Sequence, residues 1–133
     1  MMLHIRHTFI MLVLMADPGH AQECDDLSAA MEITLISRDL TEHSFHLSLT
    51  DIILNEGGLC SSSLAASGKA ERVAMLSKRH HDEKHTYWRQ CFHDGEAMVE
   101  KHIKQLKEKN LYGGRRWLSL AEELKFTHSQ NCQ

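Results

Sequence analysis

Proline is almost absent from this chain, and this constrains the fold more than any other feature. Pro18 is the only proline among 133 residues, and the later breaks are Gly57-Gly58, Asp94-Gly95 and Gly113-Gly114. Long stretches without proline, separated by few glycine breaks, favour helices over a β-sandwich with many turns. The sequence therefore predicts an all-α fold, a small disulfide-stapled bundle of four to five helices.

Apolar residues recur at three- and four-residue intervals in five segments, which predicts five helices. In the first, the β-branched middle (residues 33–36) leaves a strand as the alternative. The second also alternates as a strand would, at Phe45, Leu47 and Leu49. We favour helices because the neighbouring segments are helical and no hairpin turn is present. The expected helices cover residues 27–40, 42–56, 69–94, 96–111 and 117–124, and the third, with the most chemistry, is expected to be central.

The first 21 residues are typical of a signal peptide. Arg6 makes the start weakly positive, residues 9–16 (FIMLVLMA) form an apolar block too short to span a membrane, and Gly19 and Ala21 suit signal peptidase. We expect residues 1–21 to be removed and residues 22–133 to form a single exported domain, periplasmic or extracellular. No second long apolar run follows, so no membrane span is expected in the mature chain. The alternative is a cytosolic protein whose first helix is buried.

Four widely spaced cysteines, with no C-x-x-C pair, indicate two structural disulfides in an oxidising compartment. If the first two expected helices are antiparallel, Cys24 and Cys60 lie at the same end. We therefore predict the pairs Cys24–Cys60 and Cys91–Cys132. The other two pairings remain open from sequence alone.

Charge is distributed unevenly along the mature chain. Residues 22–60 hold eight acidic and one basic residue, whereas residues 61–133 hold nine acidic and 13 basic residues. The halves can attract one another within the fold, or the second can offer a basic face to an acidic partner. The formal net charge of −3 and the expected export argue against nucleic acid as a partner.

His81 and His85 stand four residues apart, one turn of a helix, where neutral imidazoles can share a zinc or copper ion. Asp82 follows the first histidine where the metalloprotease motif requires glutamate. The alternative is a polar helix border that binds nothing, and no other cofactor is indicated. His80 falls on the apolar face of the same helix, where we expect a core histidine hydrogen-bonded to a carbonyl or carboxylate.

Cys91-Phe92-His93-Asp94 resembles, over four residues, the cysteine and His-Asp pair of secreted phospholipases A2. The resemblance implies a small secreted hydrolase. The glycine-rich calcium loop and the cysteine density of that family are absent, and Asp94-Gly95 is equally explained as the end of a helix.

No nucleophile elbow, phosphate loop or dinucleotide-binding motif occurs, so the sequence favours a non-catalytic protein. We expect a small exported protein that binds an unidentified protein partner, as an inhibitor, immunity protein or adaptor. A histidine-rich metal-binding protein is the second hypothesis and a hydrolase the third. Arginine and tryptophan carry much of the binding energy at protein interfaces. On this basis, and on the position of Met75 on the polar side of its helix, we predict six interaction residues: Met75, Arg79, Arg89, Arg115, Arg116 and Trp117.

Overall fold

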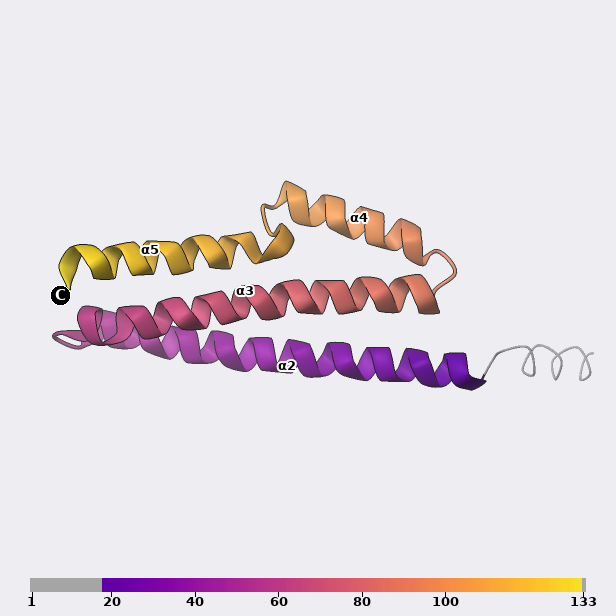
Figure 1. Cartoon of the computed structure of the whole chain (residues 1–133), viewed down its shortest axis with the longest axis horizontal. Coiled ribbons are helices and arrows are strands. Elements are labelled where there is room, and N and C mark those ends of the chain that lie inside the picture. Colours follow the sequence, from indigo (N-terminus) through magenta and orange to yellow (C-terminus); the bar gives the residue numbers. More distant parts are fainter. Residues whose placement is uncertain (1–17, 133) are drawn as a thin grey trace, which may run out of the picture.

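The computed structural model describes residues 18–132, and this part of the chain is all-α. Helix α2 (Pro18–Leu54) and helix α3 (Gly58–Cys91) lie antiparallel. Helix α4 (Gly95–Glu108), the 3₁₀ turn η1 (Tyr112–Gly114) and helix α5 (Arg115–Asn131) follow one another back along α3 as a third, bent rod (Figure 1). The described chain is thus a helical bundle of three rods. As expected for the central helix, α3 contacts every other element.

Helix α2 is one continuous helix of 37 residues, so the prediction of separate helices over 27–40 and 42–56 was wrong. No glycine or proline lies between Gly19 and Gly57 to end it. Thr41 fits inside the helix because its hydroxyl donates to the carbonyl of Ser37 at 2.8 Å. The strand alternatives for residues 33–36 and 42–56 are excluded. This merger removes one of the predicted helices, and three rods remain because α4, η1 and α5 form a single bent rod.

The corner between α2 and α3 lies at the predicted glycine pair. Gly57 is in the left-handed region with φ of 77°, and a Cβ at Gly58 would overlap the backbone carbonyl of Asp51. Helix α3 begins here, earlier than the predicted start at residue 69. Ser62 and Ser63, which lie between the second and third predicted helices, are helical, and their hydroxyls have partners: Ser62 the Asp51 carboxylate, and Ser63 the Nδ1 of His128 at 2.8 Å.

The core is built on small residues of α3 that let both neighbouring rods approach closely. Phe45 of α2 is 1% exposed and packs with the fully buried Ala66 and Ala70 of α3. Trp117 of α5 meets the Phe45 ring edge-on, with centroids 5.1 Å apart. At η1, Gly114 has φ of 71°, and a Cβ there would overlap the backbone of Ala74. The second glycine pair therefore sets how closely the bent rod lies on α3.

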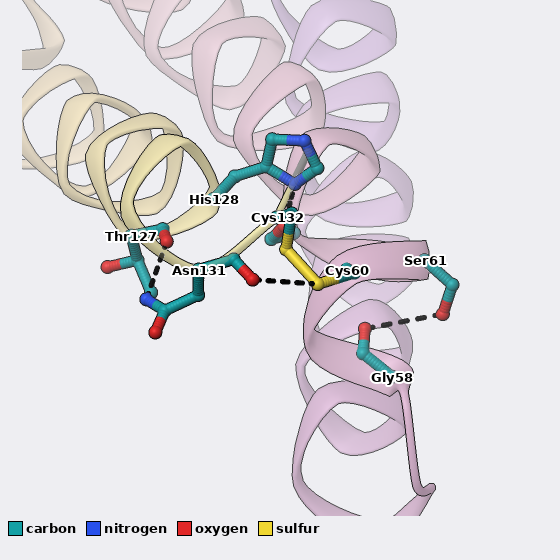
Figure 2. Close-up of a disulfide and its surroundings, with 8 residues drawn as sticks. Gly58, Cys60, Ser61, Thr127, His128, Asn131 and Cys132 are labelled. Atoms are coloured by element: carbon teal, nitrogen blue, oxygen red, sulfur yellow. Dashed lines mark hydrogen bonds between the residues drawn. A yellow bond between two sulfur atoms is a disulfide. The ribbon is translucent and has the colours of Figure 1, made fainter.

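All four cysteines form disulfides, but the pairs are Cys24–Cys91 and Cys60–Cys132, so the predicted pairing was wrong. The error follows from the helix count: Cys24 and Cys60 lie near opposite ends of α2, which at about 1.5 Å per residue is roughly 55 Å long. The first bond joins the N-terminal part of α2 to the end of α3. Figure 2 shows the second, which joins the start of α3 to the end of α5. The Cα–Cα distances are 5.8 and 5.6 Å.

The predicted signal peptide, residues 1–21, lies mostly outside the described residues, since only positions 18–21 fall within α2. Pro18 occupies the first helical position, where its missing N–H leaves no hydrogen bond unmade. Among residues 18–132, no helix combines the length and the apolar character needed to cross a membrane.

Candidate functional site

Three histidines form a cluster between α3 and α4. His81 and His85, the pair predicted from the sequence, lie on α3 and meet His102 of α4. His85 Nε2 and His102 Nδ1 are 2.8 Å apart and share a hydrogen bond. The ring centroid of His102 lies 5.3 Å from that of His81 and 5.4 Å from that of Trp88. We call His81, His85 and His102 the histidine cluster.

His102 was missed by sequence reasoning, although a signal for it exists. Val99, His102 and Leu106 follow one another at intervals of three and four residues, so His102 belongs to the stripe that α4 turns towards α3. Val99 and Leu106 are indeed buried. Periodicity judged from apolar residues alone does not register the histidine that stands between them.

Burial in the histidine cluster disfavours the charged imidazolium. It is the main cause that lowers the pKa of His81 from 6.5 to about 4, and the neighbouring imidazoles His102 and His80 add to the effect. Burial is also the main cause of the lowered pKa of His85 and of His102. The cluster is therefore neutral at neutral pH. His81 Nδ1 is buried and has no hydrogen-bond partner.

His80, beside the cluster, is confirmed as a core histidine. It is 8% exposed, and its Nδ1 lies 3.3 Å from the carbonyl oxygen of Met31 on α2. His93 and Asp94, by contrast, are exposed at the corner between α3 and α4. Asp94 occupies the position directly before α4, as expected for the end of a helix.

The histidine cluster supplies nitrogen donors for a metal ion but does not form a complete metal site. Within residues 18–132, no group of three or more His, Cys, Asp or Glu side chains has the geometry to hold a metal ion. His85 and His102 instead bind each other. The zinc or copper site at His81 and His85 stays a prediction, to which the structure adds His102 as the nearest further imidazole.

A cavity of about 250 Å³ lies beside the histidine cluster, between α2, α3 and the bent rod. Its apolar wall is formed by Leu35, Leu106, Leu111 and Trp117. Three cationic side chains also line it, one from each rod, and no carboxylate does; these cations are Arg38, Lys84 and Arg116. Ser77, His80 and His81 contribute from α3.

The predicted interaction residues lie in different surroundings. Arg79 pairs with Glu83 and Arg89 pairs with Glu96, both at 3.0 Å. Met75 and Arg115 are exposed. Arg116 and Trp117 are brought together at the cavity described above.

Helix α2 carries a row of exposed large aliphatic side chains. Four of them recur at seven-residue intervals and a fifth lies three residues after the first, and each of the five is between 58% and 73% exposed. The opposite face of the same helix carries the buried Thr34, Phe45 and Ser48. Helix α2 is thus apolar on two faces. We call the exposed set the outer stripe; it consists of Ile33, Ile36, Leu40, Leu47 and Leu54.

Carboxylates accompany the outer stripe. Asp25, Asp26, Glu32 and Asp39 are exposed on α2. The only Lys or Arg of this helix, Arg38, is turned towards α3, where its Nε donates to Ser77 Oγ at 2.8 Å. The outward side of α2 is therefore apolar and acidic. The sequence analysis did not predict this surface, because apolar spacing alone does not show which face of α2 is covered by α3.

No protein-family model, curated protein or solved structure matches this chain. The outer stripe, the histidine cluster and the cavity are consequently the features from which a function can be inferred.

Proposed function

We propose that this protein is an exported, non-catalytic protein-binding protein of the inhibitor, immunity or adaptor type, and that it binds its partner through the outer stripe of α2. The observation that carries the proposal is the exposure of five large aliphatic side chains in one row. A helix at the surface of a folded domain normally has one apolar face, and contiguous apolar surface marks an interaction site. The two disulfides suit the oxidising compartment that export implies.

The chemistry of the stripe selects one kind of partner, an amphipathic helix whose apolar face is bordered by Lys or Arg. Ile33, Leu40, Leu47 and Leu54 are spaced by seven, the interval at which two helices pair along a supercoiled seam. The neighbouring carboxylates attract basic side chains. A second copy of this chain offers no such basic border, because the only Lys or Arg of α2 is Arg38, which is turned towards α3.

The expected strength follows from the area available. Burying a large aliphatic side chain is worth about 1.5–3 kcal/mol, so five that are 58–73% exposed contribute roughly 5–10 kcal/mol. The partner's apolar face adds a similar amount, while association and side-chain ordering cost about 4–15 kcal/mol. We therefore expect a dissociation constant between about 1 μM and about 1 mM.

The test uses a synthetic helical peptide of about four heptads with leucine at the seam positions and lysine at the borders. Calorimetric titration of the oxidised protein should show saturable one-to-one binding. The double variant Leu40→Glu/Leu47→Glu should weaken binding at least about tenfold. The matched control Leu64→Glu/Phe126→Glu changes two comparably exposed apolar residues on α3 and α5, at 53% and 65% exposure, and should bind as the natural protein does.

Because both variants add the same negative charge, non-specific attraction of the basic peptide would rise equally in each. A peptide with the same seam but glutamate borders should not bind. Equal binding of the two peptides, or equal behaviour of the two variants, would overturn the proposal. So would sedimentation showing that the chain dimerises through the stripe.

Metal binding is a second candidate function, favoured by the contact between His85 and His102 beside His81. Titration with Zn²⁺ and Cu²⁺ should give one bound ion per chain. His102→Gln should abolish binding, whereas His93→Gln, which removes an exposed histidine outside the cluster, should leave it intact. No binding by the natural protein would refute this function, as would equal affinity in the two variants.

A further inference from the structure

The cavity beside the histidine cluster concentrates positive charge in a chain whose net charge is −3. We propose that it binds a small amphipathic anion, a carboxylate or sulfonate attached to a compact apolar body. This site is distinct from the outer stripe, and it requires no catalytic step.

The positive charge of the side chains that line the cavity favours an anionic ligand. Arg38, Lys84 and Arg116 come from α2, α3 and α5, so the fold, rather than a local sequence run, brings them to one cavity. The Arg38 guanidinium is partly neutralised, since its Nη1 lies 3.0 Å from both Asp39 and Glu42. Lys84 Nζ lies 5.6 Å from the Trp88 ring centroid and has no carboxylate partner among the ion pairs of residues 18–132. Arg116 is exposed. Lys84 and Arg116 are therefore the cations most available to a ligand.

The apolar side chains that line the cavity favour a ligand with a compact apolar part. Leu106 is 7% exposed and Leu35 is 38% exposed, so the cavity runs from a buried apolar side to a more open one. Leu111 and the half-buried Trp117 complete the apolar lining. A volume of about 250 Å³ is slightly below the roughly 300–1,000 Å³ of sites for drug-sized ligands. A single aromatic ring with a short acidic chain is a ligand of suitable size.

The probe is 4-phenylbutyrate, compared with the neutral 4-phenylbutanol and the cationic 4-phenylbutylamine, which have the same carbon skeleton. Calorimetry and amide NMR titrations of the oxidised protein should show one site for the acid, with shifts at residues of η1 and the start of α5. The alcohol should bind at least about tenfold more weakly, and the amine should not bind at this site. Equal affinity for the acid and the alcohol would overturn the proposal, because charge would then contribute nothing.

Two adjacent arginines provide a matched pair of variants. Arg115 and Arg116 both begin α5 and are both exposed, but only Arg116 lines the cavity. Arg116→Gln should weaken phenylbutyrate binding about five- to tenfold, and Lys84→Gln should do the same, while Arg115→Gln should leave it unchanged. Equal effects of the two arginine variants would refute the site. Leu40→Glu/Leu47→Glu should bind phenylbutyrate normally, so failure of this proposal is distinguishable from failure of the proposed function.

Discussion

Acidification should destabilise this protein through the histidine cluster before most carboxylates are protonated. The perturbation is a decrease from about pH 7.5 to about pH 4.5, applied to the natural protein and to His81→Gln. His81 is surrounded by positive or potentially positive neighbours: His80, Lys84 and His85 on α3 and His102 on α4. A proton added there enters a partly buried site with no carboxylate among these neighbours.

The direction and the size of this change in stability follow from the pKa of His81, which burial lowers from 6.5 to about 4. The unfolded chain binds this proton first, so the contribution of His81 to stability is complete above pH 6.5. It is lost progressively as the pH falls towards about 4. At 1.36 kcal/mol for each tenfold change in proton affinity, the loss is at most about 3 kcal/mol, and relaxation of a partly buried group reduces it to roughly 1–3 kcal/mol.

Guanidinium unfolding with the disulfides intact, at several pH values in this window, measures the effect. The natural protein should lose roughly 1–3 kcal/mol more stability on acidification than His81→Gln, which has no proton to gain at this position. His93→Gln, at an exposed position, is the control and should follow the natural protein. Parallel pH profiles for the natural protein and His81→Gln would refute the reasoning, as would a gain of stability on acidification.

Three further predictions concern the fold. Non-reducing peptide mapping should recover Cys24 linked to Cys91 and Cys60 linked to Cys132, and Cys60→Ser/Cys132→Ser should lower the free energy of unfolding by about 4 kcal/mol for a loop of this length. Gly114→Ala should destabilise by more than about 2 kcal/mol in chemical denaturation because of its positive φ and the Ala74 backbone. Gly68→Ala, within α3 and with open space around it, should be neutral or stabilise by up to about 1 kcal/mol. Phe45→Ala should cost about 3–5 kcal/mol, and a loss below 1 kcal/mol would contradict its place in the core.

The fold class was predictable because it depends on local features. The scarcity of proline and the three glycine breaks mark the ends of the helices, and the corners of the structure lie at those breaks. The early start of α3 could not be predicted in this way, because it involves a distant partner. Ser63 lies in a helix whose start was not expected, and its hydroxyl meets His128, which is 65 positions away in the sequence. Local preference for a loop at such serines is weak compared with this packing.

The predicted disulfide pairing was wrong because it assumed that a helix ends near Thr41. An extra helix end at this point reverses the direction of every rod that follows it, so each cysteine is placed beside a different partner. The outer stripe could not be predicted from the sequence, because Leu40 and Phe45 differ in burial and not in their apolar spacing. Both positions are apolar at helical spacing, and only the position of α3 shows which face is covered.

The two disulfides have a mechanical consequence. Cys24–Cys91 ties residues 24 and 91 together, and Cys60–Cys132 ties residues 60 and 132 together. Three backbone segments, residues 24–60, 60–91 and 91–132, therefore connect the two disulfides in parallel. A force applied between residues 24 and 132 acts on all three, and the shortest, residues 60–91 of α3, can lengthen by at most roughly 60 Å. In the oxidised protein, α3 thus limits how far the helix that carries the outer stripe can be stretched.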